Sequence, residues 1–311
     1  MLYFIVNLKS QTGNGLHNWR SIRNILDDNS IEYMSYETKY EGHAKKLASA
    51  ISAIEDENKI IVAVGGDGTV NEVINGITGF ENIRFAVIPS GSGNDFVRGH
   101  LLPSTRDEAL SYIIERCALD EYRPADLGIV TYDNTQRIFA ISSGLGLDAI
   151  VCKKALTSKL KKVLNNMHLG DLTYILLTVI SLFTMDTSDF DMTITYENGA
   201  DMNMSINKAI FAAAMNLFAE GGGVPMAPDA KGDDGLLTIT CAHGIAKWNT
   251  FFKLPLLAKG KHTNIKGFDI IPVKKLTVHT SKPNVLHADG EYLGDVTDAA
   301  FEVLPGKLRL L

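Results

Sequence analysis

The first third of the chain alternates continuous apolar runs with segments whose apolar residues recur every three or four positions. The runs at residues 2–6, 59–64 and 84–88 predict strands covered on both faces, with a further strand at residues 31–38. The helical spacing between them, as in residues 42–56, predicts helices that cover this sheet. Such a βαβα rhythm predicts a parallel sheet whose strand carboxyl ends share one edge, where ligands bind in sheets of this kind.

Beyond residue 120 the pattern changes to short β-type runs separated by turns rich in Gly, Asp and Asn. These runs lie at residues 129–132, 138–142, 192–196, 209–215, 236–241 and 275–279. They predict an antiparallel β-sandwich, interrupted by helices at residues 172–183 and 248–258. We therefore expect an N-terminal α/β domain with a parallel sheet over residues 1–122, which residues 300–311 could complete. A C-terminal β-sandwich domain is expected over residues 123–299.

Composition narrows the classes of function. The chain has 311 residues, of which 45% are hydrophobic and 21% charged, as in folded globular proteins. Its formal net charge of −6 argues against nucleic-acid binding. Cys117, Cys152 and Cys241 lie far apart, which favours a reduced, cytoplasmic compartment over disulfides or zinc. The longest apolar stretch, residues 172–185, is too short to span a bilayer, so no transmembrane segment is expected.

A glycine-rich turn follows the predicted strand at residues 59–64 and precedes a predicted helix at residues 69–77. Its sequence is Gly65-Gly66-Asp67-Gly68-Thr69. Glycines let the backbone approach a ligand closely, and a helix N-terminus attracts anions. Because Asp67 would repel phosphate unless a divalent cation lies between them, the turn predicts a nucleotide with Mg²⁺. The structural alternative is a plain strand-to-helix turn capped by Asp67, and no Walker A lysine follows.

A second turn of small residues ends the next predicted strand, with the sequence Pro89-Ser90-Gly91-Ser92-Gly93-Asn94. Alone it predicts an ordinary turn, but two such loops on neighbouring strand ends favour a phosphate site, where Ser92 could donate to phosphate. Further candidates for the same edge follow the first two predicted strands. They are Asn7, Ser10, Gly13 and Thr38.

With these loops, the sequence resembles the diacylglycerol kinase catalytic family of soluble bacterial lipid kinases, related to sphingosine kinases and, more distantly, to NAD kinases. The resemblance covers essentially the whole chain. Its motifs are GGDGTVNEV (65–73), PSGSGNDFVR (89–98), SGLGLDA (143–149) and a late Asp289-Gly290-Glu291. GGDGT is shared with NAD kinases, whereas the combination of PSGSGND with a late DGE is far more specific to the lipid kinases. The sequence departs from the family at two positions: Leu8 stands where the family usually has Pro, and Ser92 where it commonly has Thr. These departures slightly weaken the case for a nucleotide-binding role of the loop after the first strand.

The resemblance implies an N-terminal domain like that of NAD kinases and phosphofructokinases, which binds ATP. The implied nucleotide-site residues are Asn7, Ser10, Gly13, Thr38, Gly65, Gly66, Asp67, Gly68, Thr69, Val70, Asn71 and Ser92. By the same match Glu291 is the general base; Asp67 would organise Mg²⁺, and Asp289 would hold Glu291 in place or join a water network. In relatives with GGDG the loop Asp is itself favoured as base, so the choice between Glu291 and Asp67 stays open.

The resemblance also implies a second, structural Mg²⁺ in the β domain. Its ligands would be backbone oxygens of Lys231 and Leu236 and the Asp234 carboxylate. Without the resemblance, the segment Asp233-Asp234-Gly235 is read as a plain turn, because one carboxylate is a poor Mg²⁺ cage.

Residues 151–164 carry five lysines among apolar residues: Lys153, Lys154, Lys159, Lys161 and Lys162. This spacing predicts an amphipathic helix with a basic face suited to anionic lipid headgroups. A solvated surface helix is the structural alternative. The apolar residues at 172–183 and 251–257 could border an acyl-chain pocket or fill an ordinary core.

The leading prediction is an ATP-dependent kinase of a membrane lipid, with diacylglycerol first among acceptors. Phosphatidylglycerol, a sphingoid base and a polyprenol remain open, as does an NAD kinase-like activity on a small molecule. A non-enzymatic nucleotide- or lipid-binding module is disfavoured, because Asp67, Asp289 and Glu291 are all retained. The expected partner is the lipid at the inner membrane face, which the enzyme would visit peripherally; a homodimer is left open.

Overall fold

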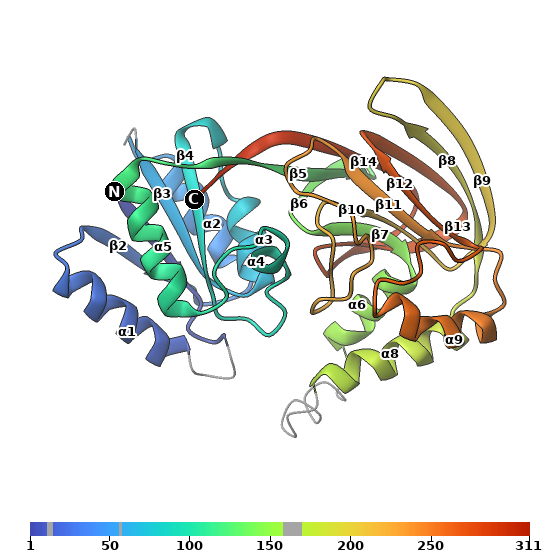
Figure 1. Cartoon of the computed structure of the whole chain (residues 1–311), viewed down its shortest axis with the longest axis horizontal. Helices are drawn as coiled ribbons and strands as arrows, with labels where there is room; N and C mark the ends of the chain where they lie inside the picture. The colour runs from blue at the N-terminus through green and yellow to red at the C-terminus, as the bar shows by residue number, and fades with distance from the viewer. Residues whose placement is uncertain (11–14, 56–57, 158–169) are drawn as a thin grey trace. The chain divides into compact units, whose positions relative to one another are not determined.

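The computed structural model describes residues 1–10, 15–55, 58–157 and 170–311, and it divides into two compact units (Figure 1). The first unit comprises residues 1–127, 232–234 and 304–311. The second comprises residues 128–231 and 235–303. Gly13 and the lysines at 159, 161 and 162 lie outside the described residues.

The first unit is built on a parallel sheet with the strand order β2-β1-β3-β4. Its strands are β1 (Leu2–Val6), β2 (Tyr33–Glu37), β3 (Lys59–Gly65) and β4 (Ile83–Pro89). Its helices are α1 (Gly15–Asp28), α2 (His43–Ser52), α3 (Asp67–Ile74), α4 (Asp95–Gly99) and α5 (Arg106–Leu119), with a short 3₁₀ helix, η2, at Phe80–Asn82.

The apolar runs of β1, β3 and β4 are buried along almost their whole length, as expected for strands covered on both faces. On one face Phe4, Val62 and Ile88 pack with Trp19 and Ile22 of α1 and with α5. Helix α2 contacts α3 and the strands β1 and β3. The predicted parallel α/β sheet is therefore confirmed, and the carboxyl ends of its strands lie at a common edge.

The second unit is an antiparallel β structure whose neighbouring strands run in the order β12-β11-β10-β7-β13. These strands are β7 (Ser142–Gly146), β10 (Phe211–Met215), β11 (Leu237–Ala242), β12 (Phe268–Val273) and β13 (Lys275–Ala288). The others are β5 (Arg123–Tyr132), β6 (Thr135–Phe139), β8 (Ser188–Thr195), β9 (Asp201–Ala209) and β14 (Glu291–Leu310). Strands β5 and β14 run through both units.

The long strand β13 pairs with β8 through its first half and with β7 through its last residues, which builds a sandwich around one apolar core. Three helices line one side of these strands (Figure 1). They are α6 (Leu147–Thr157), α8 (Gly170–Thr184) and α9 (Lys247–Leu257). None of the described helices is long and apolar enough to cross a bilayer.

Several predicted elements have other bounds in the structure, and two of these differences bear on the site. Residues 138–142 are not one strand, because β6 ends at Phe139 and β7 begins at Ser142; a carboxylate on a distant turn binds the backbone between them. Helix α3 begins at Asp67 rather than Thr69, so Gly68 lies in its first turn. The pattern of apolar residues did not reveal this start because the first turn is polar.

Candidate active site

Strand β3 passes into helix α3 through a single residue, Gly66, whose backbone is extended. The carbonyl of Gly66 accepts the first helical bonds, from the N–H groups of Thr69 and Val70 at 2.9 and 3.1 Å. A helix leaves its first N–H groups without intrahelical partners, so this turn offers donors and a positive dipole end to an anion. Gly68 is exposed, and a Cβ added to it would meet nothing within 4 Å.

The two glycine-rich loops touch backbone to backbone. A Cβ on Gly91 would lie 2.5 Å from the Cα of Gly66, and a Cβ on Gly66 would lie 2.9 Å from the Cα of Gly91. The N–H of Ser90 also donates to the carbonyl of Gly65 at 2.9 Å. Only glycine fits this approach, so the two loops form one surface at the carboxyl ends of β3 and β4.

The loop after β1 joins the same surface through two side chains. Asn7 donates from Nδ2 to Oγ1 of Thr69 at 3.1 Å, and the hydroxyls of Ser10 and Ser90 lie 2.7 Å apart. The structure thus brings together Asn7, Ser10 and Thr69 from the predicted set, together with Ser90, which the prediction left out. Ser90 lay in the quoted motif, but nothing in the sequence indicated that it faces Ser10.

The carboxylate of Asp67 ties α3 to α4, because its Oδ1 accepts a hydrogen bond from the backbone N–H of Phe96 at 3.1 Å. The side chain is half-buried beside the exposed Gly68. Asn94 shapes the second loop: it accepts from the N–H of Gly91 at 3.0 Å and donates to the carbonyl of Gly91 at 3.1 Å. A carboxylate at this open turn fits the chemistry of Mg²⁺, which prefers oxygen ligands beside phosphate.

Other predicted members of the site differ in placement. Thr38 is half-buried at the end of β2, where its N–H donates to the carbonyl of Val6 at 2.8 Å. Ser92 is exposed. Val70 and Asn71 are buried, with 2% and 1% of their surface exposed, so their side chains belong to the interior of the unit. Any contact of these two residues with a ligand would come from the backbone.

Glu72 has a role that the sequence did not indicate. Its carboxylate accepts hydrogen bonds from the N–H groups of Gly42 and Ala44, at 2.9 and 3.0 Å, and so caps helix α2. A carboxylate at a helix N-terminus is favoured by the dipole and satisfies backbone donors that the helix cannot. Glu72 therefore fixes α2 against α3, next to the glycine-rich turn.

In the second unit, Asp289 and Gly290 form the two-residue turn between β13 and β14, with φ values of 47° and 82°. Positive φ at both central residues is typical of the type I′ hairpin turn, which favours Asp-Gly. The Asp289 carboxylate accepts hydrogen bonds from the N–H groups of Ala140, Ile141 and Ser142 at 2.8, 2.8 and 3.0 Å. The turn is therefore tied to the connection between β6 and β7.

Glu291, the first residue after this turn, forms an ion pair with Arg137 of β6. The Arg137 Nη2 and the Glu291 Oε2 lie 2.5 Å apart, and both side chains are partly shielded from solvent. A guanidinium this close orients a carboxylate and stabilises its negative charge. Sequence reasoning missed Arg137, because a lone arginine 154 positions from its partner carries no local signal.

A buried polar cluster lies behind the turn. His287 Nε2 lies 3.1 Å from Asp148 Oδ2, and Ser142 donates to Glu220. Burial alone lowers the pKa of His287, but the hydrogen bond to Asp148 and the charges of Asp148, Glu220 and Asp289 outweigh it and raise that pKa. The Gly290 N–H donates to His287 Nδ1 at 3.3 Å. These contacts hold the Asp289-Gly290 turn in place.

One mixed cluster among the described residues could ligate a metal. It consists of Cys241, His243 and Asp269, whose ligand atoms lie within 4.8 Å of one another. His243 Nε2 and Asp269 Oδ2 are 2.6 Å apart, a hydrogen-bond distance. Two ligands of one tetrahedral zinc would be separated by about 3.3 Å, given metal–ligand distances of about 2.0–2.1 Å. Burial raises the pKa of the Cys241 thiol to about 12, so the arrangement is a hydrogen-bonded His–Asp pair beside a neutral thiol.

The loop suggested for a second Mg²⁺ crosses the boundary between the units. Asp234 belongs to the first unit, and Lys231 and Leu236 belong to the second. The N–H of Asp126 donates to the carbonyl of Gly232 at 2.7 Å, within the first unit. The magnesium assignment at Lys231, Asp234 and Leu236 stays a prediction.

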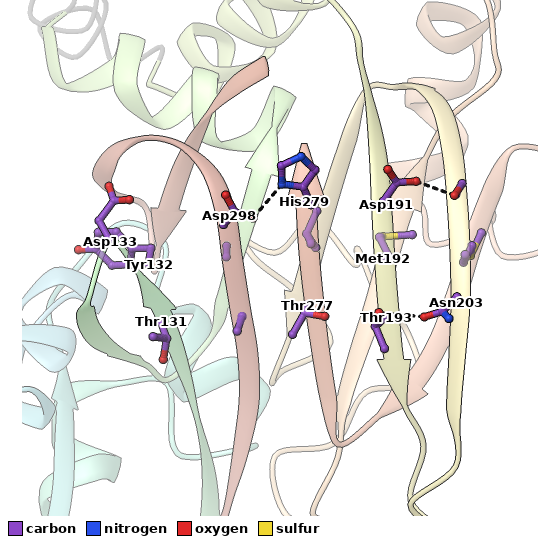
Figure 2. Close-up of a pocket in the computed structure, with 15 residues that line it drawn as sticks. Thr131, Tyr132, Asp133, Asp191, Met192, Thr193, Asn203, Thr277, His279 and Asp298 are labelled. Carbon is purple, nitrogen blue, oxygen red and sulfur yellow. Dashed lines mark hydrogen bonds and ion pairs between the residues drawn. The ribbon is translucent and has the colours of Figure 1, made fainter. Parts of the chain in front are cut away.

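A groove of about 560 Å³ crosses β5, β14, β13, β8 and β9 in the second unit (Figure 2). Its polar side chains pair with one another: His279 with Asp298 at 2.8 Å, and Ser205 with Asp191 at 2.6 Å. None of the residues predicted for the active site lines this groove. The groove therefore gives no support to a nucleotide or lipid site.

Comparison with known families accounts for both units. The description "Diacylglycerol kinase catalytic domain" matches residues 1–130. The description "YegS C-terminal NAD kinase beta sandwich-like domain" matches residues 141–311. The chain belongs to the diacylglycerol kinase family of lipid kinases. Membership confirms the resemblance found in the motifs and makes the chain an enzyme of the transferase class, in a family for which ATP and metal binding are typical.

Two relatives illustrate the family. YtlR of Bacillus subtilis, provisionally described as a lipid kinase, is 31% identical over 99% of this chain and 98% of its own length. A diacylglycerol kinase of Mycobacterium tuberculosis is 26% identical, covering 85% of this chain and 79% of its own.

Two solved structures share the fold. A diacylglycerol kinase from Bacillus anthracis has a TM-score of 0.71 at 22% identity, with 99% of this chain and 95% of that chain covered. An NAD kinase from Archaeoglobus fulgidus, in complex with ATP, has a TM-score of 0.54 at 11% identity, with 98% and 90% covered. The predicted combination of an NAD kinase-like α/β unit with an antiparallel β-sandwich is thereby confirmed.

Proposed function

We propose that this lipid kinase transfers the γ-phosphoryl group of ATP to the hydroxyl of diacylglycerol, giving phosphatidic acid. Kinase-family membership implies ATP as the donor, and the NAD kinase that shares the fold was solved with ATP. Diacylglycerol is favoured as acceptor because the family description and the mycobacterial relative both carry that name.

The observation that carries the proposal is the contact between Gly66 and Gly91. It fuses two strand-to-helix turns into one backbone surface that begins helix α3, and Gly68 leaves open space above that surface. Backbone N–H groups at a helix start suit the oxygens of a phosphate chain, and glycines permit their close approach. We propose that Asn7, Ser10, Thr38 and Ser92, with Gly13, border the nucleotide around this surface.

Mg²⁺ would be held by Asp67 and would neutralise the charge of the phosphates. Through the hydrogen bond from Phe96, the protein keeps the Asp67 carboxylate fixed between α3 and α4 before any ligand arrives. A second Mg²⁺ at Lys231, Asp234 and Leu236 would have a structural role in the β-rich part of the chain.

Glu291 is proposed as the general base. Its carboxylate would take the hydroxyl proton while the lipid oxygen attacks the γ-phosphorus, and the bond to the β-phosphate oxygen would break to release ADP. Arg137 orients the carboxylate through one oxygen, Oε2, at 2.5 Å. Asp289 positions Glu291 by fixing the turn before it.

The function is tested by incubating the protein with Mg·ATP and a panel of acceptors, with products identified by mass spectrometry. The panel contains diacylglycerol, phosphatidylglycerol, a sphingoid base, a polyprenol and NAD. Phosphorylated diacylglycerol as the main product supports the proposal. If another acceptor is phosphorylated instead, that acceptor is the substrate and diacylglycerol is not. The absence of any phosphorylated product refutes the kinase assignment.

The base is tested separately with Glu291→Gln, which is nearly isosteric and cannot accept the proton. We expect kcat to fall by about 10²–10⁴-fold while ATP binding is kept. Asp67→Asn is the comparison, and it should chiefly alter the Mg²⁺ dependence. If instead Asp67→Asn lowers kcat by about 10²–10⁴-fold, the Mg²⁺ dependence of its residual activity is unchanged, and Glu291→Gln stays active, Asp67 is the base.

A further inference from the structure

Large apolar side chains are exposed on neighbouring faces of α8 and α9. Trp248 and Phe252 of α9 are 64% and 70% exposed, and Leu256, one turn further on, is 39% exposed. On α8, Leu176 and Ile180 are 40% and 42% exposed. Each set follows the spacing of one helix face, so the residues form stripes rather than scattered positions. Single exposed apolar residues are ordinary, but contiguous ones mark an interaction surface.

Aromatic contacts join the two stripes into one surface, which we term the α8–α9 face (Leu176, Ile180, Phe183, Trp248, Phe251, Phe252 and Leu256). The ring centroid of Phe183 on α8 lies 4.8 Å from that of Trp248 and 5.9 Å from that of Phe251. Lys247 strengthens the junction by donating to the carbonyls of Phe183 and Met185 at the end of α8. The relative position of the two helices is therefore fixed by packing and by hydrogen bonds.

The α8–α9 face is exposed although its helices are firmly anchored. On its other side α9 buries Thr250 and Leu257, with Leu254 partly buried, and α8 buries Leu177 and Leu182 against the same apolar cluster. The outward residues are thus not core residues displaced by a loose helix. They are the outer surface of a well-packed pair of helices.

The segment that carries α9 has charge of one sign, whereas the exposed Asp186 follows α8. Residues 235–268 contain five lysines and neither Asp nor Glu, in a chain whose net charge is −6. These lysines are Lys247, Lys253, Lys259, Lys261 and Lys266. The last three are exposed, in the segment that follows α9. Aromatic and aliphatic side chains with a rim of lysine match the boundary of an anionic bilayer, where rings sit among headgroups and lysines meet phosphates.

A second copy of the chain matches this surface poorly. Most homodimers pair the same patch with itself, which would bring the lysines of both copies together. Lysine is also depleted from protein interfaces, whereas Trp and Lys together are common at membrane surfaces. The charge pattern therefore favours lipid over protein as the occupant.

We propose that the α8–α9 face is the membrane-docking surface of this enzyme, with Trp248 and Phe252 inserted among the lipids of an anionic bilayer. Lys259, Lys261 and Lys266 contact the phosphate headgroups. The purpose of docking rests on the proposed function, because a lipid kinase must meet its acceptor at a bilayer. The docking itself requires neither ATP nor turnover.

Trp248 makes docking directly measurable. The chain has two tryptophans, and the other, Trp19, is only 2% exposed in the core of the first unit. We expect the emission of Trp248 to shift to shorter wavelength on addition of vesicles of equal parts phosphatidylglycerol and phosphatidylcholine, and to be quenched by brominated lipid. Pure phosphatidylcholine vesicles should give a much smaller change. An unchanged emission with the anionic vesicles overturns the proposal.

Sedimentation with the same vesicles tests the residues without ATP. The double variant Trp248→Ser/Phe252→Ser should bind at least about tenfold more weakly, since most of the apolar area of both rings is lost from the contact. The matched control is Leu101→Ser/Leu119→Ser, which removes side chains 86% and 57% exposed in the first unit and should bind as the wild type does. An equal loss of vesicle affinity in both double variants would refute the proposed docking surface.

The triple variant Lys259→Gln/Lys261→Gln/Lys266→Gln should lose affinity for the anionic vesicles by roughly fivefold per lysine at low salt. The loss should shrink at high salt because surface charges are screened. Affinity unchanged at low salt removes the lysines from the contact. If the wild type instead forms a dimer that Trp248→Ser/Phe252→Ser dissociates, and no vesicle binding occurs, the face is an interface between copies.

Kinase activity measured on short-chain diacylglycerol in detergent separates the two proposals. There the double variant should retain wild-type turnover, since the acceptor is no longer in a bilayer. Vesicle binding without any kinase activity leaves docking intact and refutes the proposed function. Kinase activity in detergent without vesicle binding supports the proposed function and refutes docking.

Discussion

At Gly68 an alanine is expected to stabilise the fold but to hinder binding of the proposed ligand. Gly68 lies in the first turn of α3, its φ is not positive, and an added Cβ would meet no atom within 4 Å. None of the described residues therefore requires glycine there. Alanine is the better helix former by up to about 1 kcal/mol, so Gly68→Ala should stabilise the free protein, raising Tm by about 1–4 °C.

The same Cβ would stand where we propose that the phosphate chain approaches the backbone. Gly68→Ala should therefore weaken ATP binding by about tenfold or more, measured by isothermal titration calorimetry, while the thermal unfolding midpoint rises. A stabilised variant that binds ATP as tightly as the wild type would falsify the placement of phosphate over this turn.

Gly91→Ala is the matched comparison. Its Cβ would lie 2.5 Å from the Cα of Gly66, so the backbone of one loop must shift. Steric overpacking of this kind costs about 1–3 kcal/mol, and this variant should lose stability and ATP affinity together. The two alanine variants thus separate a glycine needed by the fold from one needed by the ligand.

Two further outcomes are expected from variants outside the glycine-rich turn at residues 65–69. Asp289→Ala leaves three backbone N–H groups without their acceptor and should lower the free energy of unfolding in urea by at least about 2 kcal/mol; a loss below half of that contradicts the bracing role. Burial and the nearby Arg123 lower the pKa of His100 to about 3, so the unfolded chain binds a proton that the folded chain excludes. His100 therefore lowers the free energy of unfolding as pH falls from about 6.5 to 3, by up to about 1.4 kcal/mol per pH unit. In that range His100→Gln should make the free energy of unfolding, measured in urea, depend less on pH. An unchanged slope would exclude His100 as the source of the pH dependence.

Local sequence was sufficient to predict the framework of both units. Buried strands such as β1 and β3 were visible because a strand covered on both faces must be apolar at every position. The glycine-rich turn was visible because strand, glycines and helix start are contiguous in sequence. Asp289 and Gly290 are also adjacent in sequence, and the type I′ turn that they form needs residues that tolerate positive φ.

Tertiary structure alone decided which side chains meet. Arg137 and Glu291 are 154 positions apart, and Asp289 is 149 positions from Ala140, so no periodicity or short motif could pair them. The capping of α2 by Glu72 and the ring contacts between α8 and α9 are of the same kind. Backbone preferences and burial patterns are local and can be read along the chain, whereas pairing depends on where distant elements pack. The sequence therefore predicted the glycine-rich turn and the family, and folding supplied the partners of Glu291 and the aromatic face on α8 and α9.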